Sequence, residues 1–319
     1  MSDGATVDFL ATVPLLEGLE EADLVELARV MRRRTVRKGE VLWRQGDDAR
    51  ELLVVVDGAL SASLHVPGDR MVEIGSAGPG QIVGEIALLD GQGHTMSVRV
   101  KEPATVLALG RLDFAALLAG QQPSAFALKR RLASLLTARL RDQLRHLAAS
   151  LDGEPANVAP ALADLEPCRP PDSRYVRRMA TFHDFDPLAL WGFLTSGRYV
   201  RCPPGRTLVA EGLPSTAYFL TINGAVEKVL VRADQRIRVG LAGPGRAFGH
   251  ESLIDGGPSP LTAITRERVV LLVLSSDLFQ QLFNGEDAVS RVFLDAIQRD
   301  LLATLRQTLR PCARLAASV

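Results

Sequence analysis

The chain has 319 residues, enough for two domains of ordinary size, each with a core of its own. Its 37 basic and 37 acidic residues cancel, so the overall charge does not favour binding to nucleic acid or to an anionic membrane. Three widely spaced cysteines without a CxxC pattern argue against a disulfide framework or a metal site and fit a reducing cytoplasm: Cys168, Cys202 and Cys312. The N-terminus carries no secretory signal, and the most apolar stretch, 269–274, is far too short to span a bilayer.

The first predicted element is an amphipathic helix, indicated by apolar residues at helical spacing: Leu24, Leu27, Ala28 and Met31. From Thr35 on, short apolar or alternating runs separated by Gly and Asp predict strands. Asp57-Gly58 lies between two such runs, and Asn223-Gly224 lies at the equivalent place in the second half. Both dipeptides accept the positive φ angles of a type I′ turn, so we expect a hairpin at each. Each half is therefore predicted to be a roll of about eight short antiparallel strands.

A long helix is expected to close each half, over residues 124–150 and 288–310. Apolar residues at steps of three and four form a stripe on each helix: Leu128, Leu132, Leu135, Leu136, Leu140, Leu144 and Leu147 on the first, and Val289, Phe293, Ile297, Leu301, Leu305 and Leu309 on the second. Pro311 is expected to end the second helix. Both stripes are long for helices that cap a small roll, so we expect each to pack against another helix.

The two halves repeat each other. Glycines recur at a fixed distance: Gly78, Gly80, Gly84 and Gly91 return 165 positions later as Gly243, Gly245, Gly249 and Gly256. Glycines kept in register mark backbone positions that tolerate no Cβ, so the repeat predicts two copies of one fold. We expect domain 1 at residues 1–150 and domain 2 at 172–319. Residues 151–171, with five prolines, are expected to form a semi-rigid linker.

The order of these elements resembles the cyclic-nucleotide-binding domain, the module of the bacterial catabolite activator family and of the regulatory subunits of cyclic-AMP-dependent kinase. Residues 78–100, GPGQIVGEIALLDGQGHTMSVRV, resemble the phosphate-binding cassette of that family. The resemblance covers residues 7–150 almost without gaps and about 176–310 less closely. It implies a mainly β fold: two tandem jelly rolls, each closed by a long C-terminal helix.

The resemblance also implies site residues. In the family a Gly starts a short helix whose N–H groups face the cyclic phosphate, a Glu accepts a hydrogen bond from the ribose, and an Arg binds the phosphate. The first half fits this pattern except that His94 stands at the Arg position, with these candidates: Gly84, Glu85, Ile86, Ala87, His94 and Thr95. In the second half Gly249 fits, but His250 replaces the Glu and Ser259 replaces the Arg. Domain 1 is therefore the better candidate for binding cyclic AMP or cyclic GMP.

Simpler interpretations stand beside these. Glu85 could be an acid favoured in the first turn of a helix, and His94 an exposed loop histidine. His250 and Glu251 could suggest a metal or acid–base pair, but no second His or Cys lies at ligand spacing, so we treat the pair as chance and expect no metal.

The resemblance implies a non-enzymatic, cytoplasmic bacterial regulator. The chain has no GxSxG, GxxxxGK[ST] or HExxH motif, which sets aside three classes of enzyme, and we predict no catalytic residue. No helix-turn-helix follows either closing helix, so we expect no direct contact with nucleic acid. The output is expected to pass through a protein partner or a homodimer formed by helices 124–150 and 288–310, or through pairing of these two helices within one chain. The alternative is an interaction or oligomerisation scaffold built from degenerate, non-binding domains.

Overall fold

The computed structural model describes residues 3–66, 70–151, 153–156, 158–162, 165–172, 175–176, 179, 182–183, 185–232 and 235–318. The chain has two compact units, Met1–Leu132 with Ala313–Val319 and Ala133–Cys312. The domain bounds expected from the sequence, 1–150 and 172–319, stay a prediction.

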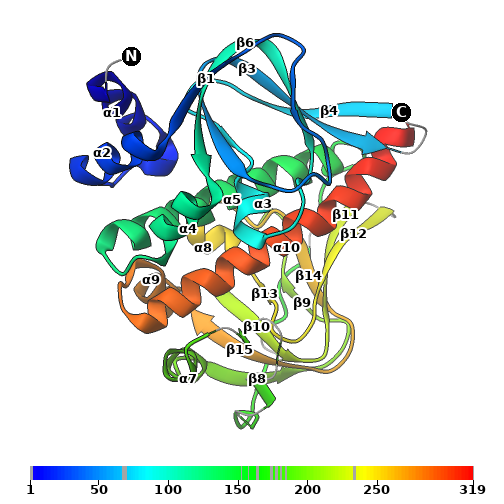
Figure 1. Ribbon diagram of the computed structural model, residues 1–319. Helices are drawn as coiled ribbons and strands as arrows, with labels where there is room; N and C mark the ends of the chain where they lie inside the picture. The colour runs from blue at the N-terminus through cyan, green and yellow to red at the C-terminus, as the bar shows by residue number, and fades with distance from the viewer. Residues whose placement is uncertain are drawn as a thin grey trace. The chain divides into compact units, whose positions relative to one another are not determined.

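The first unit consists of short helices around an antiparallel β roll (Figure 1). Its elements are α1 (Asp3–Ala11), η1 (Pro14–Leu16), α2 (Glu21–Val30), β1 (Arg32–Val36), β2 (Val41–Trp43), β3 (Glu51–Val66), β4 (Arg70–Ala77), β5 (Ile82–Val83), α3 (Glu85–Asp90), β6 (Ser97–Gly110), α4 (Arg111–Ala119) and the start of α5 (Pro123–Ala148). The strands pair in the order β1-β6-β3-β4, with β2 also on β6 and β5 on β3. The predicted helix is α2, which buries Leu24 and Leu27.

The second unit repeats this plan with its strands divided between two sheets. It contains β7 (Glu166–Pro167), α7 (Pro187–Thr195), β8 (Arg198–Cys202), β9 (Thr207–Val209), β10 (Ala217–Asn223), β11 (Val226–Arg232), β12 (Gln235–Ala242), β13 (Ala247–Phe248), α8 (Glu251–Asp255), β14 (Thr262–Thr265), β15 (Val269–Ser275), α9 (Ser276–Asn284) and most of α10 (Ala288–Ser318). One sheet has the order β13-β10-β15-β8-β7 and the other β12-β11-β14-β9. The mainly antiparallel fold with flanking helices, expected from the sequence, is confirmed.

The expected hairpins at Asp57-Gly58 and Asn223-Gly224 are wrong. β3 runs through Asp57-Gly58 without reversing and pairs with β6 on both sides of it, with shifts of register at the dipeptide. In the second unit β10 and β11 belong to different sheets, so Asn223-Gly224 carries the chain from one sheet to the other. Both dipeptides therefore form corners. The first bends β3 at a shift of register while its pairing with β6 continues, and the second separates β10 from β11. For this reason the first roll has two long bent strands, β3 and β6, where the sequence predicted several short ones.

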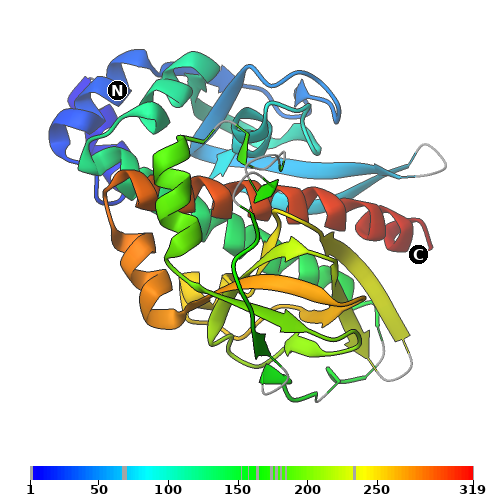
Figure 2. The ribbon, with the colours of Figure 1, turned by 90° about the horizontal axis from the view of Figure 1, so that it is seen from below.

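The closing helices are confirmed as helices, but the expected end at Pro311 is wrong. Helix α10 continues through Pro311 to Ser318, and Figure 2 shows it as one unbroken ribbon. A proline costs a helix one hydrogen bond, so the segments on either side must favour the helix enough to tolerate that loss. Within the second unit, Gln143 of α5 donates from Nε2 to the backbone oxygen of Leu305 on α10, at 3.4 Å. This hydrogen bond joins the two closing helices of one chain.

The described residues of the proline-rich stretch, 151–171, form hydrogen bonds with the second roll. Ala161 N–H donates to the oxygen of Thr207 on β9 at 2.7 Å, and Cys168 N–H donates to the oxygen of Tyr199 on β8 at 2.9 Å. Strand β7 adds two residues to the edge of β8. These hydrogen bonds give the edge strands β8 and β9 partners within the chain.

The corner glycine of the first roll gives a test of this backbone geometry. Gly58 and Gly39 have nearly the same φ, 84° and 83°. A Cβ on Gly58 would lie 2.2 Å from the backbone oxygen of Pro103, whereas a Cβ on Gly39 would meet nothing within 4 Å. We expect Gly39→Ala to lower the free energy of unfolding by roughly 1–2 kcal/mol, the ordinary cost of the left-handed region, and Gly58→Ala by about twice that or more. Guanidinium denaturation of both variants measures the difference. Equal losses of stability would contradict the close packing of Gly58 against Pro103.

Candidate functional site

The first cassette, residues 78–100, begins with a close backbone approach. Gly84 has φ +95° and leads from β5 into α3. A Cβ at this position would lie 3.0 Å from the backbone oxygen of Glu51 and 3.2 Å from Cη2 of Trp43. Any other residue would therefore be both strained and crowded here, which explains the glycine. The turn places Glu85 in the first turn of α3 with no exposed surface, and Ile86 and Ala87 are buried beside it.

His94 lies beside the same turn. Its ring stacks on Trp43, with centroids 4.2 Å apart and an angle of 10° between the planes. Its backbone is fixed on both sides, because Gly46 N–H donates to the oxygen of His94 at 2.8 Å and His94 N–H donates to the oxygen of Asp47 at 2.9 Å. His94 is only 5% exposed, so the interpretation as an exposed loop histidine is wrong. Thr95, the next candidate, is half-buried.

Trp43 connects these residues, and the sequence analysis missed it. Its Cη2 atom is close to the point that a Cβ of residue 84 would occupy, and its ring stacks on the ring of His94. The available signal was its position three residues before Gly46, a glycine that recurs 166 positions later as Gly212. The structure thus brings Gly84 and His94 together beside one indole ring, and Glu85 directly follows Gly84 in the chain.

The second cassette, residues 243–260, keeps the tight turn but changes its polar groups. Gly249 has φ +83°, and a Cβ there would lie 2.7 Å from the backbone oxygen of Ala217. His250 and Glu251 are both buried at the start of α8, with His250 Nε2 3.9 Å from Glu251 Oε1. Within the described part of the chain, neither side chain makes a hydrogen bond, and no group of His, Cys, Asp and Glu is arranged to hold a metal.

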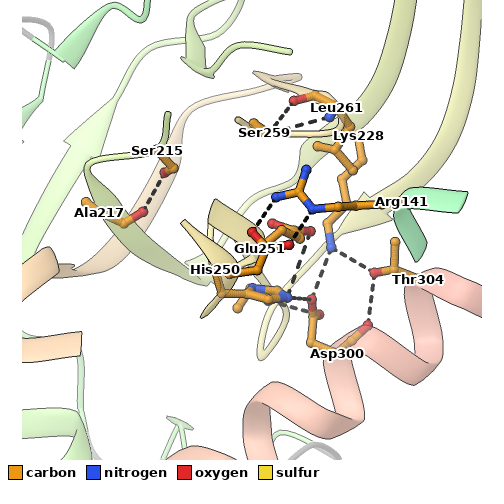
Figure 3. Close-up of polar contacts among 12 residues, drawn as sticks. Arg141, Ser215, Ala217, Lys228, His250, Glu251, Ser259, Leu261, Asp300 and Thr304 are labelled. Carbon is orange, nitrogen blue, oxygen red and sulfur yellow. Dashed lines mark hydrogen bonds and ion pairs between the residues drawn. The ribbon is translucent and has the colours of Figure 1, made fainter. Parts of the chain in front are cut away.

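Ser259, at the position of the family arginine, is occupied by its own loop. Its hydroxyl donates to the backbone oxygen of Leu261 at 2.8 Å, and its backbone N–H donates to the oxygen of Leu213 at 2.8 Å. Figure 3 shows the Ser259 and Leu261 contacts beside the other polar groups of this region. A neutral hydroxyl used in this way brings no positive charge to the second cassette.

A positive charge does lie inside the second unit, on a residue that the sequence analysis did not single out. Lys228 of β11 is 2% exposed, and its Nζ donates to Oδ2 of Asp300 at 3.1 Å and to Oγ1 of Thr304 at 3.0 Å. Figure 3 shows the lysine pointing from its strand toward these two residues of α10. Burial alone would raise the pKa of Asp300, but the positive charges of Lys228, His250 and Arg246 outweigh burial and hold that pKa below its usual value.

Arg141 of α5 binds the end of the second cassette helix. Its guanidinium donates from Nε to Asp255 Oδ2 at 2.5 Å and from Nη2 to Asp255 Oδ1 at 2.7 Å. Nη1 donates to the backbone oxygen of Pro258 at 2.5 Å. This bidentate arrangement fixes the planar guanidinium in a way that a lysine could not reproduce. The first closing helix therefore holds the loop that carries Ser259.

Comparison with known proteins now gives the family. The family profile described as the cyclic nucleotide-binding domain matches this chain twice, at residues 33–121 and 199–286, which together make more than half of its length. The chain belongs to the cyclic nucleotide-binding domain family. Both matches contain a cassette, so the two rolls are cyclic nucleotide-binding domains in tandem.

Several relatives of the domain family resemble this chain over part of their length. A cyclic nucleotide-gated potassium channel of Mesorhizobium japonicum is 36% identical over 105 residues, covering 33% of this chain and 28% of the channel. The cAMP-dependent protein kinase regulatory subunit of Aspergillus niger is 24% identical over 268 residues, covering 80% of this chain and 53% of the subunit. This chain therefore spans about a quarter to a half of these two relatives. A crystal structure of the regulatory domain of Toxoplasma gondii PKA with cAMP shares 19% identity, with a TM-score of 0.37 and coverage of 88% of this chain and 91% of that one.

The hydrogen bonds of Arg141 predict unequal effects of two substitutions on one helix. The Arg141 side chain is 17% exposed and makes the three hydrogen bonds, whereas that of Arg145 is 76% exposed and pairs with Asp142, three residues before it. We expect Arg141→Ala to lower the free energy of unfolding by about 1.5–3 kcal/mol, because it removes charge-assisted hydrogen bonds. Arg145→Ala should change it by no more than a few tenths of a kcal/mol. Urea denaturation measures both losses. Equal losses would contradict a stabilising role for the hydrogen bonds of Arg141.

Proposed function

We propose that this chain is a regulatory protein whose first roll is the receptor for a cyclic nucleotide. The proposal rests on one observation, the fully buried Glu85 directly after the crowded Gly84, within a domain of this family. In this proposal the Glu85 carboxylate accepts a hydrogen bond from the ribose. The backbone N–H groups that follow Gly84 face the cyclic phosphate, and the ring of His94 supplies positive charge beside it.

His94 sets the expected strength of binding. A charge-assisted hydrogen bond contributes about 1.5–3 kcal/mol, so a cassette without its arginine should bind the phosphate roughly ten- to a hundredfold more weakly for each such hydrogen bond that it lacks. An imidazole recovers part of this affinity when it is protonated, and a bound phosphate favours protonation. The stack on Trp43 fixes the position of the ring and so reduces the entropy that binding would otherwise cost.

The response to ligand is expected to be a shift of population between two positions of the closing helix, α5, with no chemical reaction. The signal would then pass to a protein partner or to a second copy of the chain in a homodimer, and we expect the setting to be the cytoplasm. Among the described residues, no helix is both long and apolar enough to cross a bilayer.

A second function has an observation in its favour. Ser259 replaces the family arginine in the second roll and is bound to its own loop. A roll without an anchoring charge could serve as an interaction scaffold, and the same would hold for the first roll if His94 remained neutral. The two functions differ in whether any nucleotide stabilises the protein.

Thermal denaturation with cyclic AMP or cyclic GMP tests the receptor function. Ligand at a hundredfold excess over its dissociation constant should add about 2.7 kcal/mol to the free energy of unfolding. His94→Arg should enlarge the ligand-induced shift in melting temperature, because a guanidinium stays charged at every pH at which a histidine titrates. Glu85→Gln should reduce the shift, measured against the melting temperature of the same variant without ligand.

His146→Arg is the matched control, because His146 is exposed on α5 and lies outside the cassette. It should leave the ligand-induced shift of the unsubstituted protein unchanged. No shift at millimolar nucleotide in either the natural chain or His94→Arg would rule out the receptor and leave the scaffold.

A further inference from the structure

The interior of the second unit contains a carboxylate held by donors from two different sheets. Asp300 is 5% exposed through its side chain, and its Oδ2 accepts from Nζ of Lys228 on β11 at 3.1 Å. Its Oδ1 accepts from the backbone N–H of Ala247 on β13 at 3.1 Å. His250 Nε2 lies 3.7 Å from the same carboxylate. An ammonium group, a backbone N–H and an imidazole thus converge on one buried carboxylate.

These donors belong to the roll, whereas the carboxylate belongs to the closing helix. Lys228 also donates to Oγ1 of Thr304, one turn further along α10, so its ammonium binds two residues of that helix. Arg246 adds a hydrogen bond from the roll, donating from Nη1 to the backbone oxygen of Arg299 at 3.3 Å. The hydrogen bonds that Asp300 accepts therefore also help to hold α10 on the roll.

The chemistry of the donors is that of a site for a small anion. A lysine ammonium and a backbone N–H are the groups with which proteins bind carboxylates and phosphates. A buried ammonium without a partner would be strongly destabilising, so this interior requires an anion. Lys228 binds one oxygen of the carboxylate and Ala247 N–H binds the other, so a free carboxylate placed in the same position could accept both hydrogen bonds.

We propose that the second roll has an anion-binding site formed by Lys228 and the backbone N–H of Ala247, and that Asp300 fills it from within the chain. The closing helix of this half is thus held in place by its own carboxylate, without an external ligand. The second half then acts as a fixed part of the protein, whatever the first roll binds. This inference does not depend on nucleotide binding by the first roll.

Chemical rescue tests the proposal. Asp300→Ala removes the carboxylate and leaves space beside Lys228, so the melting temperature of the full chain should fall by about 4 °C or more. Sodium formate at about 100 mM should restore at least half of this loss in a saturable way, because a small carboxylate then binds the native state. Sodium chloride at the same ionic strength should not, and formate should not stabilise the natural chain beyond the effect of chloride.

The double variant Lys228→Met/Asp300→Ala is the matched control, because it lacks the ammonium and should show no response to formate. Equal responses of the single and double variants, or no response of Asp300→Ala beyond that to chloride, would overturn the proposal. If Asp300→Ala does not fold in either salt, Lys228→Met/Asp300→Leu decides the question. Folding of this pair supports an anion that neutralises Lys228, whereas its failure to fold overturns the proposal.

Discussion

The cost of moving a charged side chain out of water shapes both rolls of this protein. A buried charge must find a partner of opposite sign or several hydrogen bonds, or the fold loses stability. In the second roll Asp300 meets this requirement with Lys228 and the backbone of Ala247, and in doing so it fixes the closing helix. In the first roll the corresponding feature is Glu85, which the crowded turn at Gly84 places beneath the surface of the cassette. The two halves thus share one fold and each buries a carboxylate in its cassette helix, Glu85 or Glu251, but the second half also buries Asp300 of its closing helix.

This difference suggests a division of roles within one chain. The first cassette has a buried carboxylate and a stacked imidazole, and in the proposed receptor these would serve a ligand that carries a hydroxyl and an anion. The second cassette is held at both ends by the protein itself, by Asp300 on the inner side and by Arg141 at the end of its helix. Duplication followed by loss of ligand groups in one copy would give a sensing domain joined to a rigid one.

The fold could be predicted from the sequence because glycines at backbone positions with positive φ repeat in order, and because apolar stripes mark the closing helices. The prediction of hairpins was wrong because an Asp-Gly dipeptide suits both a corner within a strand and a tight turn between two strands. Only the strand pairing distinguishes the two. The predicted helix end at Pro311 was wrong because the stability of the long helix outweighs the loss of one hydrogen bond at the proline. The pairing of Lys228 with Asp300 could not be predicted from the sequence. Each residue resembles a solvent-facing charge on its own element, and the two lie 72 positions apart.

The number of cyclic nucleotide molecules bound per chain is the most direct test of the whole account. Isothermal titration calorimetry with cyclic AMP and cyclic GMP should give one site per chain, and Glu85→Gln should weaken that site, whereas Ser259→Ala should leave it unchanged. Two equivalent sites per chain, or a single site that keeps its affinity in Glu85→Gln, would contradict the account.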